Sequence, residues 1–293
     1  MATPAQWLEG ARPRTLPAAV APVLAGTGVA VHLGQAVWWK ALLALVVSLA
    51  LQVGVNYAND YSDGIRGTDA DRVGPLRLVG SAAATPGSVR LAAFACFGAA
   101  SAVGLVLAAT TSWWLVAVGL LCIVAAWFYT GGRRPYGYHA LGEVMVFVFF
   151  GLVAVMGTTY VQTESLGRES LLPSLFAAVG VGALACAILV ANNLRDIPTD
   201  RDADKRTLAV VLGEEKTRGL YVFLVVAAAV ALVGLGFETT RWSMLGFAYL
   251  VAAVPAIRTV LSGTTGRGLV PVLQRTGLAG LVYAGGIFLG LLV

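Results

Sequence analysis

The aspartates of this chain are confined to two short segments of an otherwise very apolar sequence. The 293 residues contain eight of them: Asp60, Asp63, Asp69 and Asp71 in the first segment, and Asp196, Asp200, Asp202 and Asp204 in the second. The mean hydropathy of +0.81 places most of such a chain in lipid. There, an acidic side chain at mid-bilayer costs on the order of 3 kcal/mol. Carboxylates gathered in this way indicate a cation, and the cation indicates the chemistry.

Hydrophobic runs predict an all-α, polytopic membrane protein. The chain is 58% hydrophobic and 12% charged, unlike a soluble domain. Runs of roughly 18 to 25 residues, long enough to span a bilayer, lie at about 15–33, 38–58, 89–110, 113–130, 140–161, 173–194, 218–237, 242–261 and 276–293. We expect a single domain over residues 1–293, a bundle of nine transmembrane helices with two Asp-rich cytoplasmic loops. Eight helices is the alternative, because only residues 110–112 separate the third run from the fourth.

Charge asymmetry predicts the orientation of the bundle. With nine helices and a cytoplasmic N-terminus, 17 of the 20 Lys and Arg residues fall in inner segments, and only Lys40, Arg168 and Arg241 in outer ones. Basic residues accumulate on the cytoplasmic side of membrane proteins. Four crossings separate the two acidic segments, so both are expected at the cytoplasmic face of the plasma membrane. Basic inner loops favour anionic lipid and phosphate, and nothing indicates nucleic acid.

The first acidic segment is spaced to place oxygen ligands on one helix face. Asn56, Asp60 and Asp63 stand at i, i+4 and i+7, and Asn59 precedes Asp63 by four residues. Residues with these spacings lie on the same side of an α-helix. The end of the second helix can therefore direct several oxygen atoms at one point.

The second acidic segment repeats this spacing. Asn192, Asp196 and Asp200 are four residues apart, as are Asn56 and Asp60. Pro198 lies between the two aspartates and is expected to kink the helix end, because it lacks a backbone N–H. The repeat is too short to establish a duplication.

Two acidic segments flanked by basic residues indicate a diphosphate site held by Mg²⁺. Donors that are all oxygen suit a hard cation, and Mg²⁺ commonly joins one or two carboxylates to substrate phosphates. The flanking bases, Arg66, Arg72, Arg77, Lys205 and Arg206, would hold the remaining phosphate charge. Ordinary solvated loops of mixed charge are the simpler alternative. Solvated loops would explain a single acidic segment well. They explain less well why two segments share the same spacing and lie on the same side of the membrane.

An apolar bundle around a diphosphate site indicates a lipid substrate, and a polyprenyl diphosphate fits. Loss of the diphosphate would leave an allylic cation that needs shielding from water and stabilisation by aromatic faces. The aromatic candidates by position are Tyr57, Tyr61, Trp127, Tyr129, Phe147, Phe149 and Phe150. Aromatic residues at such positions also serve as lipid-facing or interfacial belts.

These motifs resemble the UbiA superfamily of intramembrane prenyltransferases, whose arrangement is nine helices. The shared pattern is Asn59-Asp60-x-x-Asp63 with Asp196-x-x-x-Asp200. One branch, the 1,4-dihydroxy-2-naphthoate polyprenyltransferases of menaquinone biosynthesis, is similar also in Ala11-Arg12-Pro13-Arg14-Thr15-Leu16-Pro17, Asp71-Arg72-Val73-Gly74-Pro75-Leu76-Arg77, Tyr129-Thr130-Gly131-Gly132, Gly137-Tyr138-His139 and Lys205-Arg206-Thr207-Leu208. Many superfamily members carry an aspartate where this chain has Gly67; the naphthoate branch, like this chain, does not.

The resemblance implies Mg²⁺-dependent transfer of a polyprenyl group to the ring carbon that bears the carboxylate of 1,4-dihydroxy-2-naphthoate. Carbon dioxide and a proton are lost, and a demethylmenaquinone precursor is formed. The implied ligands of two Mg²⁺ ions are Asn59, Asp60, Asp63, Asp69, Asp196 and Asp200, with Asp60, Asp63, Asp196 and Asp200 catalytic. The implied substrate-binding residues are Asn56, Arg66, Arg72, Arg77, Tyr129, Arg134, Tyr138, Glu143, Asn192, Asn193, Lys205 and Arg206.

Several alternatives stay open at this stage. The same chemistry on another acceptor, such as 4-hydroxybenzoate, is the nearest. An ion-coupled transporter also gathers acids and broken helices, though usually at mid-membrane, and a lipid phosphotransferase normally uses one compact motif. The sequence leaves open the prenyl chain length, the oligomeric state and the choice between Asp69 and Asp71. It also leaves open whether Arg12 and Arg14 meet the naphthoate carboxylate or lipid headgroups.

Overall fold

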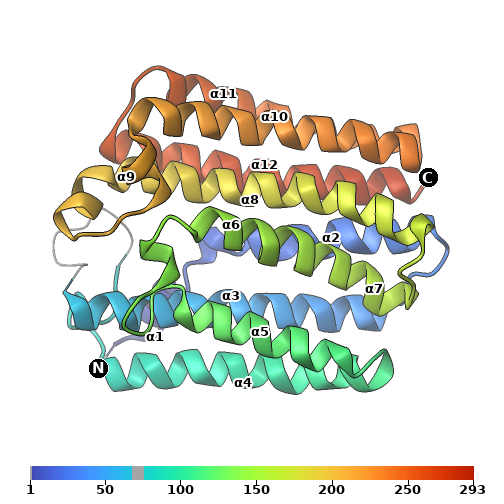
Figure 1. The fold of residues 1–293 in the computed structure, drawn as a ribbon. Helices are drawn as coiled ribbons and strands as arrows, with labels where there is room; N and C mark the ends of the chain where they lie inside the picture. Colours follow the sequence, from blue (N-terminus) through green and yellow to red (C-terminus); the bar gives the residue numbers. More distant parts are fainter. Residues whose placement is uncertain (1, 68–75) are drawn as a thin grey trace.

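The chain folds into a bundle of long helices in the computed structural model, which describes residues 2–67 and 76–293 (Figure 1). The longer helices are α2 (Pro17–His32), α3 (Trp38–Arg66), α4 (Pro86–Thr110), α5 (Trp114–Phe128), α8 (Arg168–Asp202), α10 (Glu214–Glu238), α11 (Leu250–Leu261) and α12 (Val270–Leu291). Shorter elements are α1 (Pro4–Gly10), η1 (Pro13–Thr15), η2 (Tyr136–Tyr138), α6 (Gly142–Val146), η3 (Phe147–Met156), α7 (Gly157–Thr163), α9 (Leu208–Leu212), η4 (Arg241–Tyr249) and η5 (Gly266–Leu269). The described ranges contain no β-strand, and one isolated bridge pairs His139 with Arg206.

Seven helices of the described part are long and apolar enough to cross a membrane. They are Trp38–Arg66, Pro86–Thr110, Gly142–Thr163, Arg168–Asp202, Glu214–Glu238, Arg241–Leu261 and Gly266–Leu291. An eighth forms if Pro4–Thr15 and Pro17–His32, which meet at a bend of 48°, count as one span. The remaining expected span is α5, an apolar helix of 15 residues. At 1.5 Å per residue it covers only about 22 Å of a hydrocarbon core of about 30 Å. The protein is therefore a multi-pass membrane protein, and its described part contains seven or eight clear spans.

Parts of the two segments that were expected as loops are helical, since Asp60 and Asp63 lie in α3 and Asp196, Asp200 and Asp202 lie in α8. Helix α3 continues past Asp63 to Arg66 and is capped by Gly67, whose φ of +72° lies in the left-handed region that glycine favours. Helix α8 continues through Pro198 to Asp202. Hydropathy marks where the apolar surface of a helix ends, and a helix can extend into water beyond that point. Asp69, Asp71 and Arg72 lie outside the described residues.

Helix α8 occupies the centre of the bundle, in contact with α2, η3, α10 and α12. Small residues allow this close packing. A Cβ atom on Gly180 would lie 1.9 Å from the Tyr283 hydroxyl, and one on Gly151 would lie 2.8 Å from the Cα of Gly182. Close backbone approach supplies the van der Waals contact that holds membrane helices together. Figure 1 shows the C-terminal ends of α3 and α8 at the same end of the bundle, which confirms that the two acidic segments face the same side.

Candidate active site

Both acidic segments contribute to one cavity of about 240 Å³, which we call the polar cavity. Its polar lining consists of Gln52, Asn59 and Asp63 from α3, of Asn192, Asn193, Asp196 and Asp200 from α8, and of Arg12, Thr15, Arg77, Tyr129, Thr130, Tyr138, Lys205 and Thr207 from connecting segments. Carboxylates, amides and cations thus face a shared space at one end of the bundle. The four-residue spacing grouped Asn59 with Asp63 on α3, and Asn192 with Asp196 and Asp200 on α8, and these residues line the cavity.

Asp63 is surrounded by donors from other parts of the chain. The Tyr138 hydroxyl donates to its Oδ1 at 2.6 Å. The Lys205 Nζ lies 3.7 Å from Oδ1, and the Arg77 Nη2 lies 4.0 Å from Oδ2. The Lys205 ammonium also stands 4.6 Å from the centre of the Tyr138 ring. Lys205, which follows the second acidic segment, therefore balances the charge of Asp63 in the first segment. This ion pair joins the two segments.

Asp196 is held by its sequence neighbour. The Arg195 guanidinium donates through Nε to Oδ1 and through Nη2 to Oδ2, both at 2.6 Å, and both side chains are buried. The same Nη2 also donates to the Asn192 side-chain oxygen at 2.9 Å. Sequence reasoning placed Arg195 in the motif but not among the site residues. The signal that could have identified Arg195 was its position next to Asp196 at the end of an apolar span. Charged side chains in such places are rarely left unpaired.

Asp60 faces away from the polar cavity. It is fully buried, and its two carboxylate oxygens accept hydrogen bonds from the backbone N–H groups of Leu78 at 2.8 Å and Val79 at 3.0 Å. One turn along α3, a Cβ on Gly64 would lie 2.4 Å from Val79 Cγ1. Asp60 therefore anchors the 76–80 turn onto α3, and this turn carries Arg77 to the cavity. The prediction that it ligates metal finds no support in this arrangement.

Arg66 and Thr130 join the first acidic segment to the chain after α5. The Arg66 guanidinium donates to the carbonyl oxygens of Thr130 and Gly132 and lies 5.4 Å from the centre of the Tyr138 ring. The Thr130 hydroxyl donates to Asn59 Oδ1 at 2.8 Å. Arg66 is thus engaged in holding this segment, and it does not line the cavity that it was predicted to serve.

Three further predicted binding residues lie outside the cavity lining. Arg134 and Arg206 are exposed, and the Arg206 backbone N–H donates to the Tyr138 carbonyl at 3.1 Å. Glu143 is buried behind the lining, where its Oε1 accepts from Asn193 Nδ2 at 2.9 Å. Glu143 thus orients Asn193, which does face the cavity.

The N-terminal segment contributes the Arg12 guanidinium to the site, a residue whose role the sequence left open. Arg12 lines the polar cavity, and its Nη2 donates to the Asn56 carbonyl at 3.4 Å. Its φ of +54° is unusual for a residue with a Cβ atom, and more so before a proline. Such strain persists where surrounding contacts enforce it, commonly at functional sites. Arg14, by contrast, is exposed.

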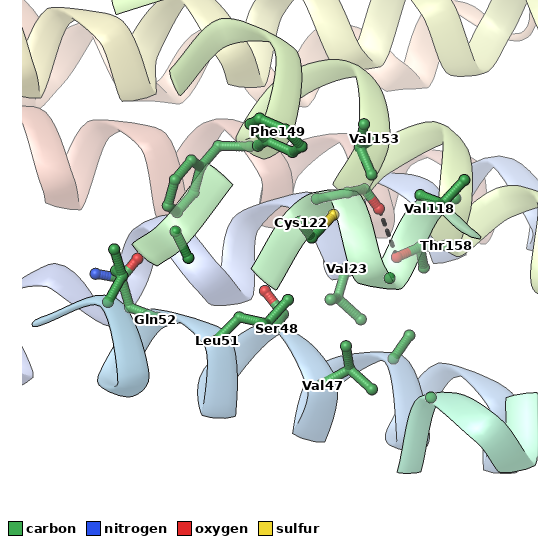
Figure 2. A pocket seen from close by; sticks show the side chains of 18 of the residues that line it. Val23, Val47, Ser48, Leu51, Gln52, Val118, Cys122, Phe149, Val153 and Thr158 are labelled. Carbon is green, nitrogen blue, oxygen red and sulfur yellow. Dashed lines mark hydrogen bonds between the residues drawn. The ribbon is translucent and has the colours of Figure 1, made fainter. Parts of the chain in front are cut away.

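An apolar cavity of about 360 Å³ adjoins the polar one (Figure 2). We call it the apolar cavity; its lining includes Val23, Val47, Ser48, Leu51, Gln52, Asn56, Val118, Cys122, Tyr129, Tyr136, Phe149, Phe150, Val153 and Thr158. Gln52, Asn59, Tyr129, Val146 and Phe150 line both spaces, which therefore meet. Burial raises the pKa of the Tyr136 phenol above its ordinary value, and the hydroxyl donates to the Ala125 carbonyl at 2.7 Å.

The aromatic candidates separate into two groups. Tyr129, Phe149 and Phe150 line the apolar cavity, and the two phenylalanines belong to η3, a π-helical stretch of 10 residues. Such stretches are rare and frequently occur at functional sites. Tyr57, Tyr61, Trp127 and Phe147 are absent from the lining of both cavities. The stacked rings of Tyr61 and Trp127, 6.0 Å apart, instead pack α3 against α5.

The donor set of the polar cavity fits a hard divalent cation in its chemistry. The possible metal ligands are carboxylate and side-chain amide oxygens, from Asn59, Asp63, Asn192, Asp196 and Asp200. The basic side chains that line the same cavity could bind a phosphate group. Within residues 2–67 and 76–293, however, no three His, Cys, Asp or Glu side chains are grouped closely enough to hold a metal ion. The carboxylates are held instead by Arg195, Lys205 and Tyr138.

Comparisons with known proteins give matches over most of the chain. Residues 19–267 match the UbiA prenyltransferase family. The chain is 57% identical over 284 residues to the 1,4-dihydroxy-2-naphthoate octaprenyltransferase of Mycobacterium tuberculosis, covering 97% of this chain and 96% of that protein. It is 38% identical to the Escherichia coli protein of the same name, with 97% and 95% covered. A UbiA homolog from Archaeoglobus fulgidus bound to GPP and Mg²⁺ shares the fold, with a TM-score of 0.66 at 14% identity over 98% of this chain and 100% of that one.

Proposed function

The chain belongs to the UbiA prenyltransferase family, and from this premise we propose that it prenylates 1,4-dihydroxy-2-naphthoate with loss of carbon dioxide, giving demethylmenaquinol, the quinol form of demethylmenaquinone. The prenyl donor is a polyprenyl diphosphate. The observation that carries the proposal is the junction of a charged cavity with an apolar one inside a membrane bundle. The names of the relatives at 57% and 38% identity support the naphthoate acceptor.

The two cavities suit the two parts of the donor. The diphosphate is expected in the polar cavity, where Arg77 and Lys205 supply positive charge and Tyr138 supplies a hydroxyl donor. The first isoprene units are expected in the apolar cavity against Phe149 and Phe150. The solved homolog bound to GPP and Mg²⁺ supports a donor of this class.

Asn59, Asp63, Asp196 and Asp200 are the residues that would hold Mg²⁺, as two ions. Asp69 stays a prediction, because it lies outside the described residues. When bound, the metal supplies the positive charge that makes diphosphate a good leaving group. For Asp60 we propose a positioning role through the turn that carries Arg77.

The proposed reaction exchanges one carbon–carbon bond for another. The allylic C–O bond breaks, and its electron pair leaves with the diphosphate. The ring carbon that bears the carboxylate bonds to the allylic carbon. The carboxylate then leaves as carbon dioxide, and its bonding pair restores the aromatic ring; a carboxylic acid would also release its proton. The faces of Tyr129, Phe149 and Phe150 shield the cation from water in this scheme.

We propose further that the bundle crosses the plasma membrane nine times with the polar cavity on the cytoplasmic side. The bent N-terminal pair and the short α5 would complete the seven clear spans. The distribution of 17 of the 20 Lys and Arg residues supports this orientation.

A prenyl-transfer assay tests the proposal. Purified protein in detergent is given a polyprenyl diphosphate with either 1,4-dihydroxy-2-naphthoate or 4-hydroxybenzoate, in Mg²⁺ or in EDTA, and product mass is followed. We expect a product from the naphthoate that forms only in Mg²⁺. Its mass should be lower, by one carbon dioxide, than that of a prenylated naphthoate that keeps its carboxyl group. Product with the benzoate alone would refute the acceptor but keep the reaction class. Absence of product with both acceptors, from folded protein, would refute prenyl transfer to either.

A further inference from the structure

Gln52 presents a buried hydrogen-bond acceptor that the protein does not satisfy. Gln52 lies near the middle of α3 and is 7% exposed. Its Nε2 donates to the Thr15 hydroxyl at 3.1 Å and to Asn56 Oδ1 at 3.4 Å. Among residues 2–67 and 76–293, no group donates a hydrogen bond to its Oε1. A buried acceptor without a partner is costly, more so in a membrane helix, and such a group commonly has a ligand.

Backbone carbonyls fix which way the Gln52 amide points. Asn56 Nδ2 donates to the Ala11 carbonyl at 2.9 Å, so Asn56 turns its oxygen toward Gln52. The Thr15 hydroxyl donates to the Arg12 carbonyl at 2.9 Å, so its oxygen accepts from Gln52. Both neighbours therefore require the NH₂ group of Gln52 on their side. The Oε1 is left as the atom that faces away from them.

Gln52 stands where the two cavities meet, since it lines both. Figure 2 shows it beside Leu51 and Ser48 at one end of the apolar cavity. It lies eleven residues before Asp63 on α3, or about 16 Å along the helix axis. That places it beyond the diphosphate end and within reach of the region where the tail begins.

The chemistry of the Oε1 atom selects the ligand. It lies too far along α3 from Asp63 to share a metal ion bound there, and it accepts hydrogen bonds but cannot donate, so a hydrogen-bonding partner must carry an O–H or N–H group. A prenyl tail has neither, and an ionised diphosphate offers only acceptors. A hydroxyl group on an aromatic acceptor has the required O–H. The Arg12 guanidinium, which also lines the polar cavity, suits the carboxylate of the same molecule.

We propose that Gln52 Oε1 accepts a hydrogen bond from a ring hydroxyl of the hydroxylated aromatic acceptor and so selects and orients that substrate. The inference rests on the proposed function for the identity of the acceptor. It adds a residue to the acceptor side of the site, whereas the aspartates and bases serve the diphosphate side.

Equilibrium binding to the purified protein tests this role, with the Gln52→Met variant beside wild type. The Gln35→Met variant is the matched control, because it makes the same change at an exposed position outside both cavities. We expect Gln52→Met to weaken binding of 1,4-dihydroxy-2-naphthoate about tenfold, as for one hydrogen bond to a buried group. Binding of a prenyl diphosphate should be unchanged in both variants. Unchanged naphthoate binding, or an equal loss for both ligands, overturns the proposal.

Two monohydroxy analogues give a test that needs no variant. Wild-type protein should bind one of 1-hydroxy-2-naphthoate and 4-hydroxy-2-naphthoate about tenfold more weakly than the parent compound. Equal binding of all three overturns the proposal even if Gln52→Met fails to fold. Wild-type protein that binds the naphthoate through Gln52 but forms no prenylated product would refute the proposed function and leave this acceptor site standing.

Discussion

The Asp60→Asn variant distinguishes an anchoring role for this residue from metal binding. Aspartate offers two charged oxygens to the N–H groups of Leu78 and Val79, at 2.8 and 3.0 Å. Asparagine offers one neutral oxygen and turns its NH₂ toward the other N–H. A hydrogen bond to a charged group contributes about 1.5–3 kcal/mol and a neutral one about 1 kcal/mol. One bond is lost and one weakened, so we expect the free energy of unfolding to fall by about 2–5 kcal/mol.

The loss of these hydrogen bonds in the Asp60→Asn variant should lower thermal stability and change the kinetics. On the scale of soluble domains, 2 kcal/mol corresponds to a fall in Tm of about 4–8 °C. Because the released turn carries Arg77, the KM for the prenyl diphosphate should rise, while the KM for the naphthoate stays close to wild type. Thermal unfolding in detergent and initial rates measure the two effects.

Asp202→Asn is the matched control for Asp60→Asn. Asp202 is the exposed last residue of α8 and does not line the polar cavity. The same change there should alter Tm by less than about 1 °C. An Asp60→Asn protein as stable as wild type but inactive would refute the anchoring role and restore Asp60 as a metal ligand.

Two further predictions address opposite ends of the bundle. Asp63→Asn should lower kcat/KM about 100-fold and raise the Mg²⁺ concentration for half-maximal rate; an unchanged Mg²⁺ titration would contradict the proposed ligand set. At the far end of α3, the buried Lys40 ammonium is bound by Glu164 at 2.6 Å and by the Thr110 carbonyl and Thr111 hydroxyl at 3.0 Å. Because Glu164 is half-exposed and its ion pair is screened by solvent, Lys40→Met should cost only about 1–2 kcal/mol. Its KM values should match wild type, and altered kinetics would show coupling to the site.

Much of the bundle and of the polar cavity could be predicted from local patterns. Apolar runs located the long helices, and the even number of crossings between the two acidic segments predicted that Asp63 and Asp196 lie at the same end of the bundle. α5 could not be settled in this way, because its 15 residues are too short to span by length alone. The helix ends were also predicted too early, since hydropathy reports contact with lipid and not helix formation.

Asp60 shows where spacing stops being informative. It lies on the same broad face of α3 as Asn56 and Asp63, so periodicity groups it with the ligands. Its partners come from the turn at Leu78 and Val79, whose position depends on tertiary packing. Gln52 was missed for a related reason: a single amide inside an apolar run barely changes hydropathy. Extending the helical spacing one turn before Asn56 would have found it.

The meeting of a charged cavity with an apolar one has a consequence for turnover under the proposed reaction. Both substrates arrive with an anionic group, a diphosphate on one and a carboxylate on the other. The reaction removes both anions, so the quinol product retains nothing that the cations around Asp63 can hold. It is expected to partition along its own tail into the bilayer, whereas the diphosphate departs toward water. The chemistry itself would thereby sort the two products into different phases.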